Sequence, residues 1–399
     1  MSTAARSSFR LRAGSRFRRI FLEQLEDRSL LASVDDCSTV VANTNDAGAG
    51  SLRDAINCSN STPGTQTISF NISGSGVHTI TPTSSLWLTD AAIIDGFTQP
   101  GASPNTNGPG LGDNSVHLIE LSGISGGGST HGLVLDGVSG ATIRGLVINR
   151  FGQTGIFVRN SSNTKIEGNF VGTDPTGSLA QGNTFDGIDV IGWVDAPSIP
   201  TNNVIGGSSP AARNIISGNS GLAFGIDIIA LGKGNGFVQN TIIQGNFIGT
   251  DATGTLSLAN TKGINVGVNT SGTMIGGANA GEGNLISGNG NSGIELGGAQ
   301  NTCTGAGLTN GPSGGNIVRG NKIGTDVTGT KPLGNLMDGV SVGYESPSTT
   351  VIGGKEAGEG NIIAFNGLHG VGVLRSTTSI LSNSIFSNTQ LGVHLGVTG

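Results

Sequence analysis

Two asparagines recur in a fixed frame through most of the chain. Seven successive units fit the pattern aliphatic, any residue, Gly, Asn, any residue, aliphatic, followed by a second Asn and then Gly, aliphatic, any residue, aliphatic. The first Asn column is Asn169, Asn214, Asn246, Asn284, Asn321, Asn361 and Asn383, and the second is Asn183, Asn219, Asn260, Asn289, Asn335, Asn366 and Asn388. The last unit, from Asn361 to Asn383, spans 22 residues, which is too short for a helix-containing repeat with these breakers.

Aliphatic residues accompany the asparagines in bursts with a period of two. The closing column, for example, reads Ile188, Ile226, Ile264, Ile294, Val340, Val371 and Val393. Such bursts, separated by Gly and Asn, indicate short strands, and self-similarity at a fixed period indicates a solenoid. We therefore expect a parallel β-helix, in which each unit is one coil and each column stacks on itself at a spacing of about 4.8 Å.

The recurring Asn and Gly predict specific local roles in such a coil. Asn at a corner tolerates left-handed backbone geometry, and stacked amides can hydrogen-bond from coil to coil as a ladder. The Gly that precedes the closing aliphatic pair is expected to provide a sharp turn into the next strand.

Two kinds of insertion alternate along the repeat and define a double unit of 70 to 77 residues. One kind contains "GTDxTG" and carries Asp174, Asp251 and Asp326. Active sites rarely occur in triplicate along a rod, so we interpret these acids as Asx turns closed by Gly. The other kind contains "AGEG", and its Glu282 and Glu359 are interpreted as solvated loop acids.

Composition narrows the possible functions. Glycine accounts for 71 of 399 residues and only 12% of residues are charged, which indicates a turn-rich chain. Residues 1–32 carry a formal charge of +4, so the remaining chain carries −10, with no basic stripe of the kind that tracks phosphates. We therefore expect no nucleic-acid binding. No apolar run approaches the length of about 18 residues needed for a transmembrane helix.

The N-terminal third contains a separate module. Residues 1–34 are rich in Arg and lack the apolar core of a secretory signal, and we interpret them as a disordered targeting segment. Residues 35–115 are expected to form a cap module and the first coils, with a helix over "SLRDAIN" closing the open end of the solenoid. Cys37 and Cys58 flank this helix and are predicted to form a disulfide; the alternative is two half-buried thiols, and Cys303 is expected to be unpaired.

These patterns resemble known families. Residues from about 130 to 399 resemble the right-handed parallel β-helix repeat proteins of the pectate-lyase-like superfamily, through the columns given above. Residues 37–101 resemble the CSLREA-type N-terminal module, through "VVANTNDAGAGSLRDAIN" and "IIDGFTQPG". The stretch "FLEQLEDRSLLA" resembles the LEPR-XLL segment of large exported bacterial proteins, with Asp27 in the usual place of Pro.

The resemblance implies an all-β, right-handed parallel β-helix solenoid with a short N-terminal helical cap, located outside the cell or at its surface. The β-helix is expected to run from 116 to 399. The last residues, "GVHLGVTG", stop within a coil. We therefore interpret the sequence as truncated at its C-terminus; the alternative is that a partner covers the last coil.

One outward-facing row could carry chemistry. The residues between the closing aliphatics are Phe157, Asp189, Asp227, Asn265, Glu295, Ser341, Gly372 and His394. Asp189, Asp227 and Glu295 could bind Ca²⁺ through oxygen ligands, as do pectate lyases, which belong to the superfamily that this chain resembles. The alternative is that Asn265 interrupts the row, Lys262 neutralises part of it and solvent screens the rest.

Two histidines are candidates for a catalytic role. His131 and His369 are each followed by Gly, which resembles the "GHG" of polygalacturonases. The accompanying elements of that family are absent, so the role does not transfer, and no zinc spacing occurs. The sequence therefore assigns no catalytic residue and no bound cofactor.

Few aromatic side chains are available for a sugar-processing cleft, with 2 Trp, 1 Tyr and 14 Phe. We therefore predict an exported, non-catalytic rod for surface attachment or a structural stalk, with extracellular polysaccharide or cell-surface components as partners. One alternative is a polysaccharide-binding protein, or a polysaccharide lyase or glycoside hydrolase, that uses the Asp189, Asp227 and Glu295 face with Arg159 or Lys262 as its cation. Another is a spacer within a larger adhesin.

Overall fold

The computed structural model describes residues 37–193, 198–221, 224–231, 238–297, 313–343, 350–374 and 376–396. The predicted targeting segment at 1–34 and the expected unpaired Cys303 lie outside these ranges. No helix within them has both the length and the apolar character needed to cross a bilayer.

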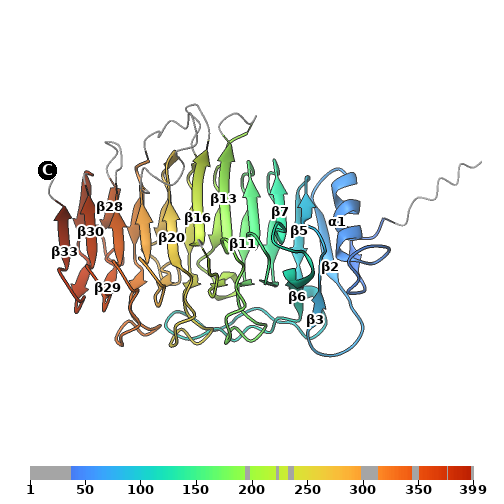
Figure 1. The fold of residues 1–399 in the computed structure, drawn as a ribbon, viewed down its shortest axis with the longest axis horizontal. Helices are drawn as coiled ribbons and strands as arrows, with labels where there is room; N and C mark the ends of the chain where they lie inside the picture. Colours follow the sequence, from blue (N-terminus) through green and yellow to red (C-terminus); the bar gives the residue numbers. More distant parts are fainter. Residues whose placement is uncertain are drawn as a thin grey trace, which may run out of the picture. The chain divides into compact units, whose positions relative to one another are not determined.

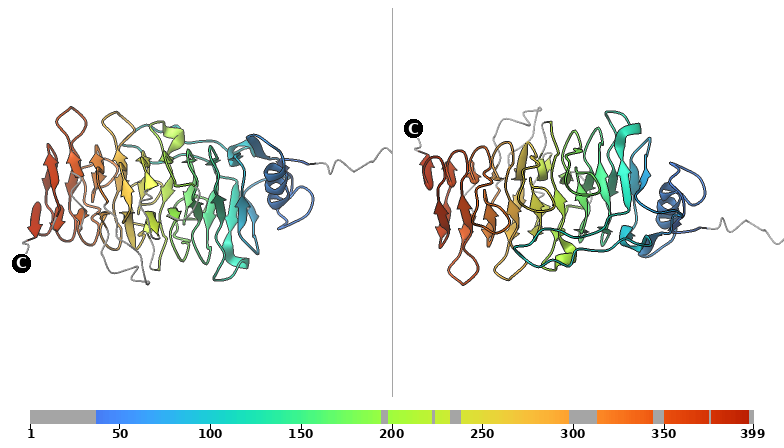
Figure 2. Two further views of the ribbon diagram at one scale, coloured as in Figure 1. Left: turned by 90° about the horizontal axis from the view of Figure 1, so that it is seen from above. Right: turned by 90° about the horizontal axis from the view of Figure 1, so that it is seen from below.

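Residues 38–399 form one compact unit, a right-handed parallel β-helix, and the boundary predicted near residue 115 falls inside it. Each coil contributes one strand to each of three parallel sheets, which we name A, B and C. The coils follow one another in chain order from the blue end to the red end (Figure 1), and the two further views show the same order (Figure 2). The predicted fold class is confirmed.

Sheet A contains 11 strands. They are β1 (Val40–Val41), β2 (Gln66–Phe70), β5 (Ala92–Asp95), β8 (Thr142–Arg144), β11 (Lys165–Glu167), β14 (Val204–Gly206), β18 (Ile242–Gln244), β22 (Met274–Gly276), β25 (Ile317–Arg319), β28 (Thr350–Gly353) and β31 (Thr378–Leu381).

Sheet B contains 10 strands. They are β3 (His78–Ile80), β6 (Ile119–Ser122), β9 (Val147–Asn149), β12 (Phe170–Val171), β15 (Ile215–Ile216), β19 (Phe247–Ile248), β23 (Leu285–Ile286), β26 (Lys322–Ile323), β29 (Ile362–Ala364) and β32 (Ser384–Phe386).

Sheet C also contains 10 strands. They are β4 (Leu86–Leu88), β7 (Leu133–Asp136), β10 (Ile156–Arg159), β13 (Ile188–Trp193), β16 (Phe224–Leu231), β20 (Lys262–Val266), β24 (Ile294–Leu296), β27 (Val340–Val342), β30 (Val371–Leu374) and β33 (Val393–Gly396). A further pair joins β17 (Val238–Gln239) to β21 (Thr270–Ser271), and the helical elements are α1 (Leu52–Ser61) and the 3₁₀ turns η1 (Gly96–Thr98), η2 (Gly123–Ser125) and η3 (Pro210–Ala212).

The aliphatic columns stack in the predicted register. Ile188 pairs with Ile226, and Ile226 pairs with Ile264, along the middle of sheet C. All three side chains are fully buried in a single hydrophobic cluster that extends from Val41 to Val373. Like residues therefore meet like residues on successive coils, as a parallel solenoid requires.

Both asparagine columns form continuous amide ladders. In the first ladder, each side-chain N–H donates to the Oδ1 of the next coil, for example Asn246 to Asn284 at 3.0 Å and Asn284 to Asn321 at 2.9 Å. In the second ladder the equivalent bonds measure 2.9 Å to 3.1 Å, from Asn183 through to Asn388. The predicted ladder is confirmed, and each amide also donates to a backbone carbonyl, as Asn284 does to Ile243 O at 2.8 Å.

The backbone geometry predicted for the asparagines is wrong. No ladder asparagine has a positive φ; the residue before it often does, as with Gly168 (φ 64°), Gly245 (φ 71°) and Gly320 (φ 68°). The glycine takes the left-handed conformation at no steric cost, so the asparagine keeps ordinary geometry and aims its amide at the next coil.

The glycines before the closing aliphatic pair also have a different role from the predicted one. Gly187 and its equivalents do not have positive φ. A Cβ at Gly187 would lie 2.7 Å from Gly225 O and 2.8 Å from the Nδ2 of Asn219. Glycine is therefore required here because the next coil and the second ladder leave no room for a side chain, and not because the backbone makes a sharp turn.

The N-terminal end is closed by α1, as predicted. Ser51 caps the helix by accepting a hydrogen bond from the backbone N–H of Asp54, and Leu52, Ala55 and Ile56 are buried in the main cluster. Helix α1 lies at the blue end of the coils in Figure 1. Cys37 and Cys58 are both disulfide-bonded.

A long segment, residues 101–118, runs along the outside of sheet B, and we call it the strap (cyan in Figure 1). Asn105 donates to Pro210 O at 3.0 Å, and the backbone N–H of Asp113 donates to Ala252 O at 2.7 Å. His117 is buried between the rings of Phe97 and Phe170, with centroids at 5.4 Å and 4.1 Å. Burial lowers the pKa of His117 to about 4, so it anchors the strap as a neutral ring.

A second hydrophobic cluster joins the outer face of sheet B to the "GTDxTG" loops. It consists of Val147, Phe170, Ile215, Phe247, Ala252, Leu285 and Val327. The outer face of sheet B is therefore covered over these coils, and the residues that cover it come from sequence positions far apart.

The ladders generate a stability prediction. Replacing Asn284 by Ala removes the acceptor of Asn246 and the donor to Ile243 O inside the unit. Because unpaired buried polar groups are costly, we expect the free energy of unfolding to fall by about 2–4 kcal/mol, measured by urea denaturation. Asn45→Ala, at an exposed position, should change it by no more than about 0.5 kcal/mol; equal losses in the two variants would contradict the proposed importance of the ladder.

Candidate functional site

The outward row of sheet C lies in the predicted register. Asp189 pairs with Asp227, Asp227 with Asn265, and Asn265 with Glu295. Asp189 and Asp227 are therefore on neighbouring strands, whereas Glu295 lies two strands beyond Asp227.

Three carboxyl groups form what we call the acid cluster, Asp186, Asp189 and Asp227. Asp186 lies just before β13 and accepts the backbone N–H of Phe224 at 2.7 Å. Asp227 accepts the Nδ2 of Asn265 at 2.6 Å, whereas Asp189 Oδ1 is buried without a hydrogen-bond partner in the described structure. Asp186 and Asp189 are only 5% and 8% exposed. Sequence reasoning missed Asp186; its position two residues before the closing aliphatic pair was the available signal.

Burial and mutual repulsion keep protons on this cluster. Burial, together with the Asp227 charge, raises the pKa of Asp186 to about 8. Burial and the same charge raise the pKa of Asp189 well above its ordinary range. Burial raises the pKa of Asp227 to about 6 against the opposing hydrogen bond from Asn265. At neutral pH, Asp227 is therefore the member of the cluster that ionises most readily.

The two cations predicted near this face are already in ion pairs. Lys262 Nζ lies 3.0 Å from Glu295 Oε2, and 4.9 Å from the centroid of the Phe224 ring. Arg159 donates its Nε–H to Asp136 at 2.8 Å, and its guanidinium lies 5.4 Å from the centroid of the Trp87 ring. Neither Lys262 nor Arg159 forms an ion pair with a member of the acid cluster.

The predicted calcium ligands do not lie together as one set. Asn265 separates Asp227 from Glu295 in the register, and Lys262 neutralises Glu295. Within the part of the chain that the structure describes, no group of three or more His, Cys, Asp or Glu side chains could hold a metal ion. Ca²⁺ favours several ionised oxygen ligands, whereas the raised pKa values of Asp186 and Asp189 leave Asp227 as the one member of the cluster that ionises readily. Calcium binding by Asp189, Asp227 and Glu295 stays a prediction that this geometry does not support.

The "GTDxTG" acids form turns, as interpreted from the sequence. Asp174 Oδ1 accepts the backbone N–H groups of Ser178 and Leu179 at 2.9 Å each, and Gly177 closes the turn with a 2.9 Å bond to Asp174 O. Asp251 and Asp326 repeat the pattern. These carboxylates are occupied by their own loops.

Glu282 and Glu359 are half-buried turn acids rather than solvated ones. Glu359 accepts a hydrogen bond from Arg319 at 2.7 Å and from the backbone N–H of Glu356 at 3.0 Å. Glu282 accepts the backbone N–H of Asn279 at 3.0 Å. The repeat of "AGEG" therefore reflects a self-capped turn.

The two histidines considered as catalytic candidates lie on opposite sides of the acid cluster along sheet C. His131 stacks on Phe157 with ring centroids 4.7 Å apart, and burial lowers its pKa. His369 Nδ1 lies 2.9 Å from Asp338 Oδ1, and its ring stacks on His394 with centroids 4.4 Å apart. The structure does not bring either histidine to the acid cluster.

Comparisons with known proteins concern the fold. The sequence matches no protein-family model and no curated protein. Similar solved structures include a periplasmic alginate epimerase (TM-score 0.34, 13% identity, covering 85% of this chain and 79% of that chain). An alginate lyase from Paenibacillus sp. str. FPU-7 gives a TM-score of 0.33 at 13% identity, covering 90% and 99%. The surface protein and adhesin PfbA of Streptococcus pneumoniae gives 0.36 at 11%, covering 89% and 99%. Enzymes and an adhesin both appear, so the comparison does not separate the two functions.

The acid cluster predicts an unusual pH dependence of stability. The pKa of Asp186 rises from 3.8 to about 8 on folding, so the folded chain binds its proton more tightly than the unfolded chain does. The contribution of the protonated Asp186 carboxyl to stability is complete below pH 3.8 and is lost as the pH rises through about 8. We expect the thermal unfolding midpoint to be lower at alkaline than at mildly acidic pH.

Asp189→Asn removes one carboxyl from the cluster and should flatten this pH dependence, raising the midpoint on the alkaline side. Glu167→Gln, which removes a half-buried acid from sheet A, serves as the control and should preserve the slope. Differential scanning fluorimetry across the pH range measures both variants. An unchanged slope in Asp189→Asn would contradict the proton-holding cluster.

Proposed function

We propose that the chain is an exported, non-catalytic β-helical rod that attaches to extracellular polysaccharide or cell-surface components through the outer face of sheet C. The observation that carries this proposal is the arrangement of that face. Its outer row carries Trp87, Phe157, Asp227, Glu295 and His394, with smaller or neutral residues on the strands between them. Its cations Arg159 and Lys262 are paired within the chain.

The spacing of sheet C supports binding to an extended polymer. Parallel strands repeat at about 4.8 Å, so equivalent side chains recur at regular steps along the unit. Trp87 is 43% exposed, and Phe157 and His394 of the same sheet stack on His131 and His369, which lie just before β7 and β30. Rings of this kind provide apolar contact area together with polar edges.

The state of the charged groups supports a passive role. Catalysis on an anionic sugar would use a free cation and an accessible acid–base pair. Lys262 and Arg159 are each paired with a carboxylate, and Asp186 and Asp189 are buried. Export is supported by the resemblance of "FLEQLEDRSLLA" to the LEPR-XLL segment, which lies outside the described residues.

A second candidate function is cleavage of a polysaccharide at the acid cluster. It is favoured by one observation, the different pKa values of Asp186 (about 8), just before β13, and Asp227 (about 6), on the neighbouring β16. Two carboxyls whose environments separate their pKa values can divide the roles of general acid and general base.

Binding and turnover on a panel of uronic-acid polymers test the two functions together. Affinity electrophoresis measures binding, and ultraviolet absorbance and reducing-end assays measure cleavage, each with and without Ca²⁺. We expect binding without product, weakened about tenfold by Trp87→Ala because an exposed ring is lost. Phe386→Ala, an exposed ring on sheet B, is the matched control and should bind normally.

Two outcomes contradict the passive rod. The first is unsaturated product or new reducing ends that disappear in Asp227→Asn, which would establish the enzymatic alternative. The second is equal weakening by Trp87→Ala and Phe386→Ala, which would remove sheet C as the binding face.

A further inference from the structure

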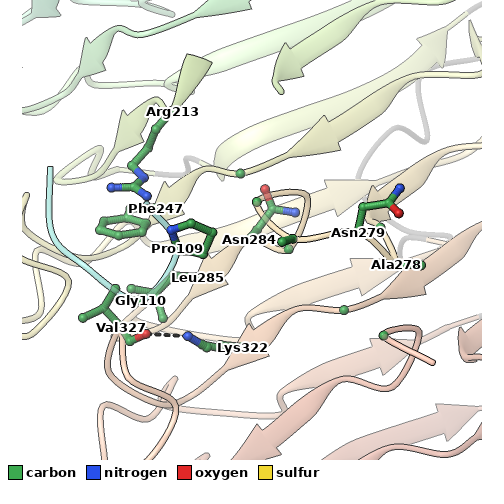
Figure 3. Close-up of a pocket in the computed structure, with 17 residues that line it drawn as sticks. Pro109, Gly110, Arg213, Phe247, Ala278, Asn279, Asn284, Leu285, Lys322 and Val327 are labelled. Carbon is green, nitrogen blue, oxygen red and sulfur yellow. Dashed lines mark hydrogen bonds between the residues drawn. The ribbon is translucent and has the colours of Figure 1, made fainter. Parts of the chain in front are cut away.

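A cavity of about 200 Å³ lies on the outer side of sheet B, away from the acid cluster of sheet C. Pro109 and Gly110 of the strap form part of its wall, and Arg213, Phe247, Lys322 and Val327 from the coils form another part (Figure 3). Much of the remaining wall is glycine backbone. A Cβ at Gly245 would lie 2.3 Å from Gly207 O, so this part of the wall cannot carry side chains.

Arg213 is a buried cation without an ion pair in the described structure. Arg213 is only 7% exposed, and its guanidinium lies 4.4 Å from the centroid of the Phe247 ring. Its hydrogen bonds go to backbone carbonyls of the strap, at 3.2 Å each to Leu111 O and Gly112 O, while its Nε has no partner. A guanidinium keeps its charge even when buried, so this site holds a positive charge with unused donor capacity.

Lys322 is a second cation in the wall of the same cavity. Its Nζ donates to Val327 O at 2.5 Å, the bond drawn in Figure 3, and it forms no ion pair with any described residue. Burial lowers its pKa, the charge of Asp326 raises it, and the charge of Arg213 lowers it further. The charge of Arg213 thus acts against that of Lys322, and both side chains line the same cavity.

The acids nearest to these cations are held by other groups. Asp326 accepts hydrogen bonds from its own loop, including the 2.7 Å bond from Thr328. Asp113 in the strap accepts from Ser115 through Oδ1, its Oδ2 is buried without a hydrogen-bond partner, and burial raises its pKa. The charge of Asp113 acts on Arg213, but the two side chains do not form an ion pair. The positive charge around the cavity is thus incompletely compensated.

We propose that this cavity binds a small oxyanion group, a carboxylate, sulfate or phosphate, between Arg213 and Lys322. An anion in the cavity would offset the positive charge of both Arg213 and Lys322, which line its wall. Charge-assisted bonds of this kind are among the strongest hydrogen bonds in proteins. The volume is below the range of about 300–1,000 Å³ typical of sites for drug-sized ligands, which favours a compact anionic group.

This site is independent of the function proposed for sheet C. The oxyanion could be free in solution or be part of an acidic sugar. Isothermal titration calorimetry of the whole chain with sodium sulfate, inorganic phosphate and a galacturonate oligomer distinguishes the sources. Ionic strength is held constant with chloride, because screening alone would otherwise change the affinity.

Variants of the two cations provide the decisive comparison. Lys322→Gln should weaken binding of the successful probe about tenfold or more, because one charge-assisted contact is lost. Arg213→Gln should do the same, but it also loses three bonds to the strap, so Lys322→Gln is the cleaner variant. Lys165→Gln removes an exposed cation from sheet A and should leave the affinity unchanged.

Asp113→Asn tests whether the acid in the strap is the true partner of Arg213. We expect it to preserve or tighten binding, because a competing negative charge is removed.

Binding of sulfate or phosphate that depends on Lys322 supports a site for free anions, and competition between sulfate and the oligomer supports an acidic sugar. Absence of heat with all three probes, or equal weakening by Lys165→Gln and Lys322→Gln, would overturn the proposal.

Discussion

Hydrogen bonding between the side-chain amides of neighbouring coils is the constraint on which the rest of the structure depends. The ladder amides from Asn169 to Asn366 are buried, and each must find both a donor and an acceptor. Only one register places Asn284 Oδ1 against the Asn246 amide while its own N–H groups meet Asn321 and Ile243 O. A slip by one residue would leave a row of buried amides unpaired, so the two ladders hold every aliphatic column in line.

Because the ladders and the aliphatic columns stabilise the inside of each coil, the outer faces of the three sheets are free to differ. Sheet C keeps polar and aromatic side chains on its outer row. Sheet B is covered over several coils by the strap and by the Asp turns, which enclose a second hydrophobic cluster. One face can thus offer an extended surface, whereas the other encloses a discrete cavity lined by Arg213 and Lys322.

The candidate sites differ in how far the sequence anticipated them. The neighbouring positions of Asp189 and Asp227 follow from the repeat alone, since equal positions in consecutive units must stack. The burial that raises the pKa of Asp189 does not follow, and neither does the pairing of Lys262 with Glu295. Local conformation was also harder to predict than stacking: Gly245 takes the left-handed geometry that had been expected of asparagine.

The sequence by itself determined the repeat, the parallel register, both amide ladders and the helical cap, because each of these depends on residues at fixed spacing. The tertiary structure alone decided the strap and the cavity, because residues 101–118 have no periodic signal and contact Pro210 and Ala252 far along the chain. It also decided which charges are solvated. The pKa of a carboxyl depends on the groups packed around it in three dimensions, and no spacing along the chain records that packing.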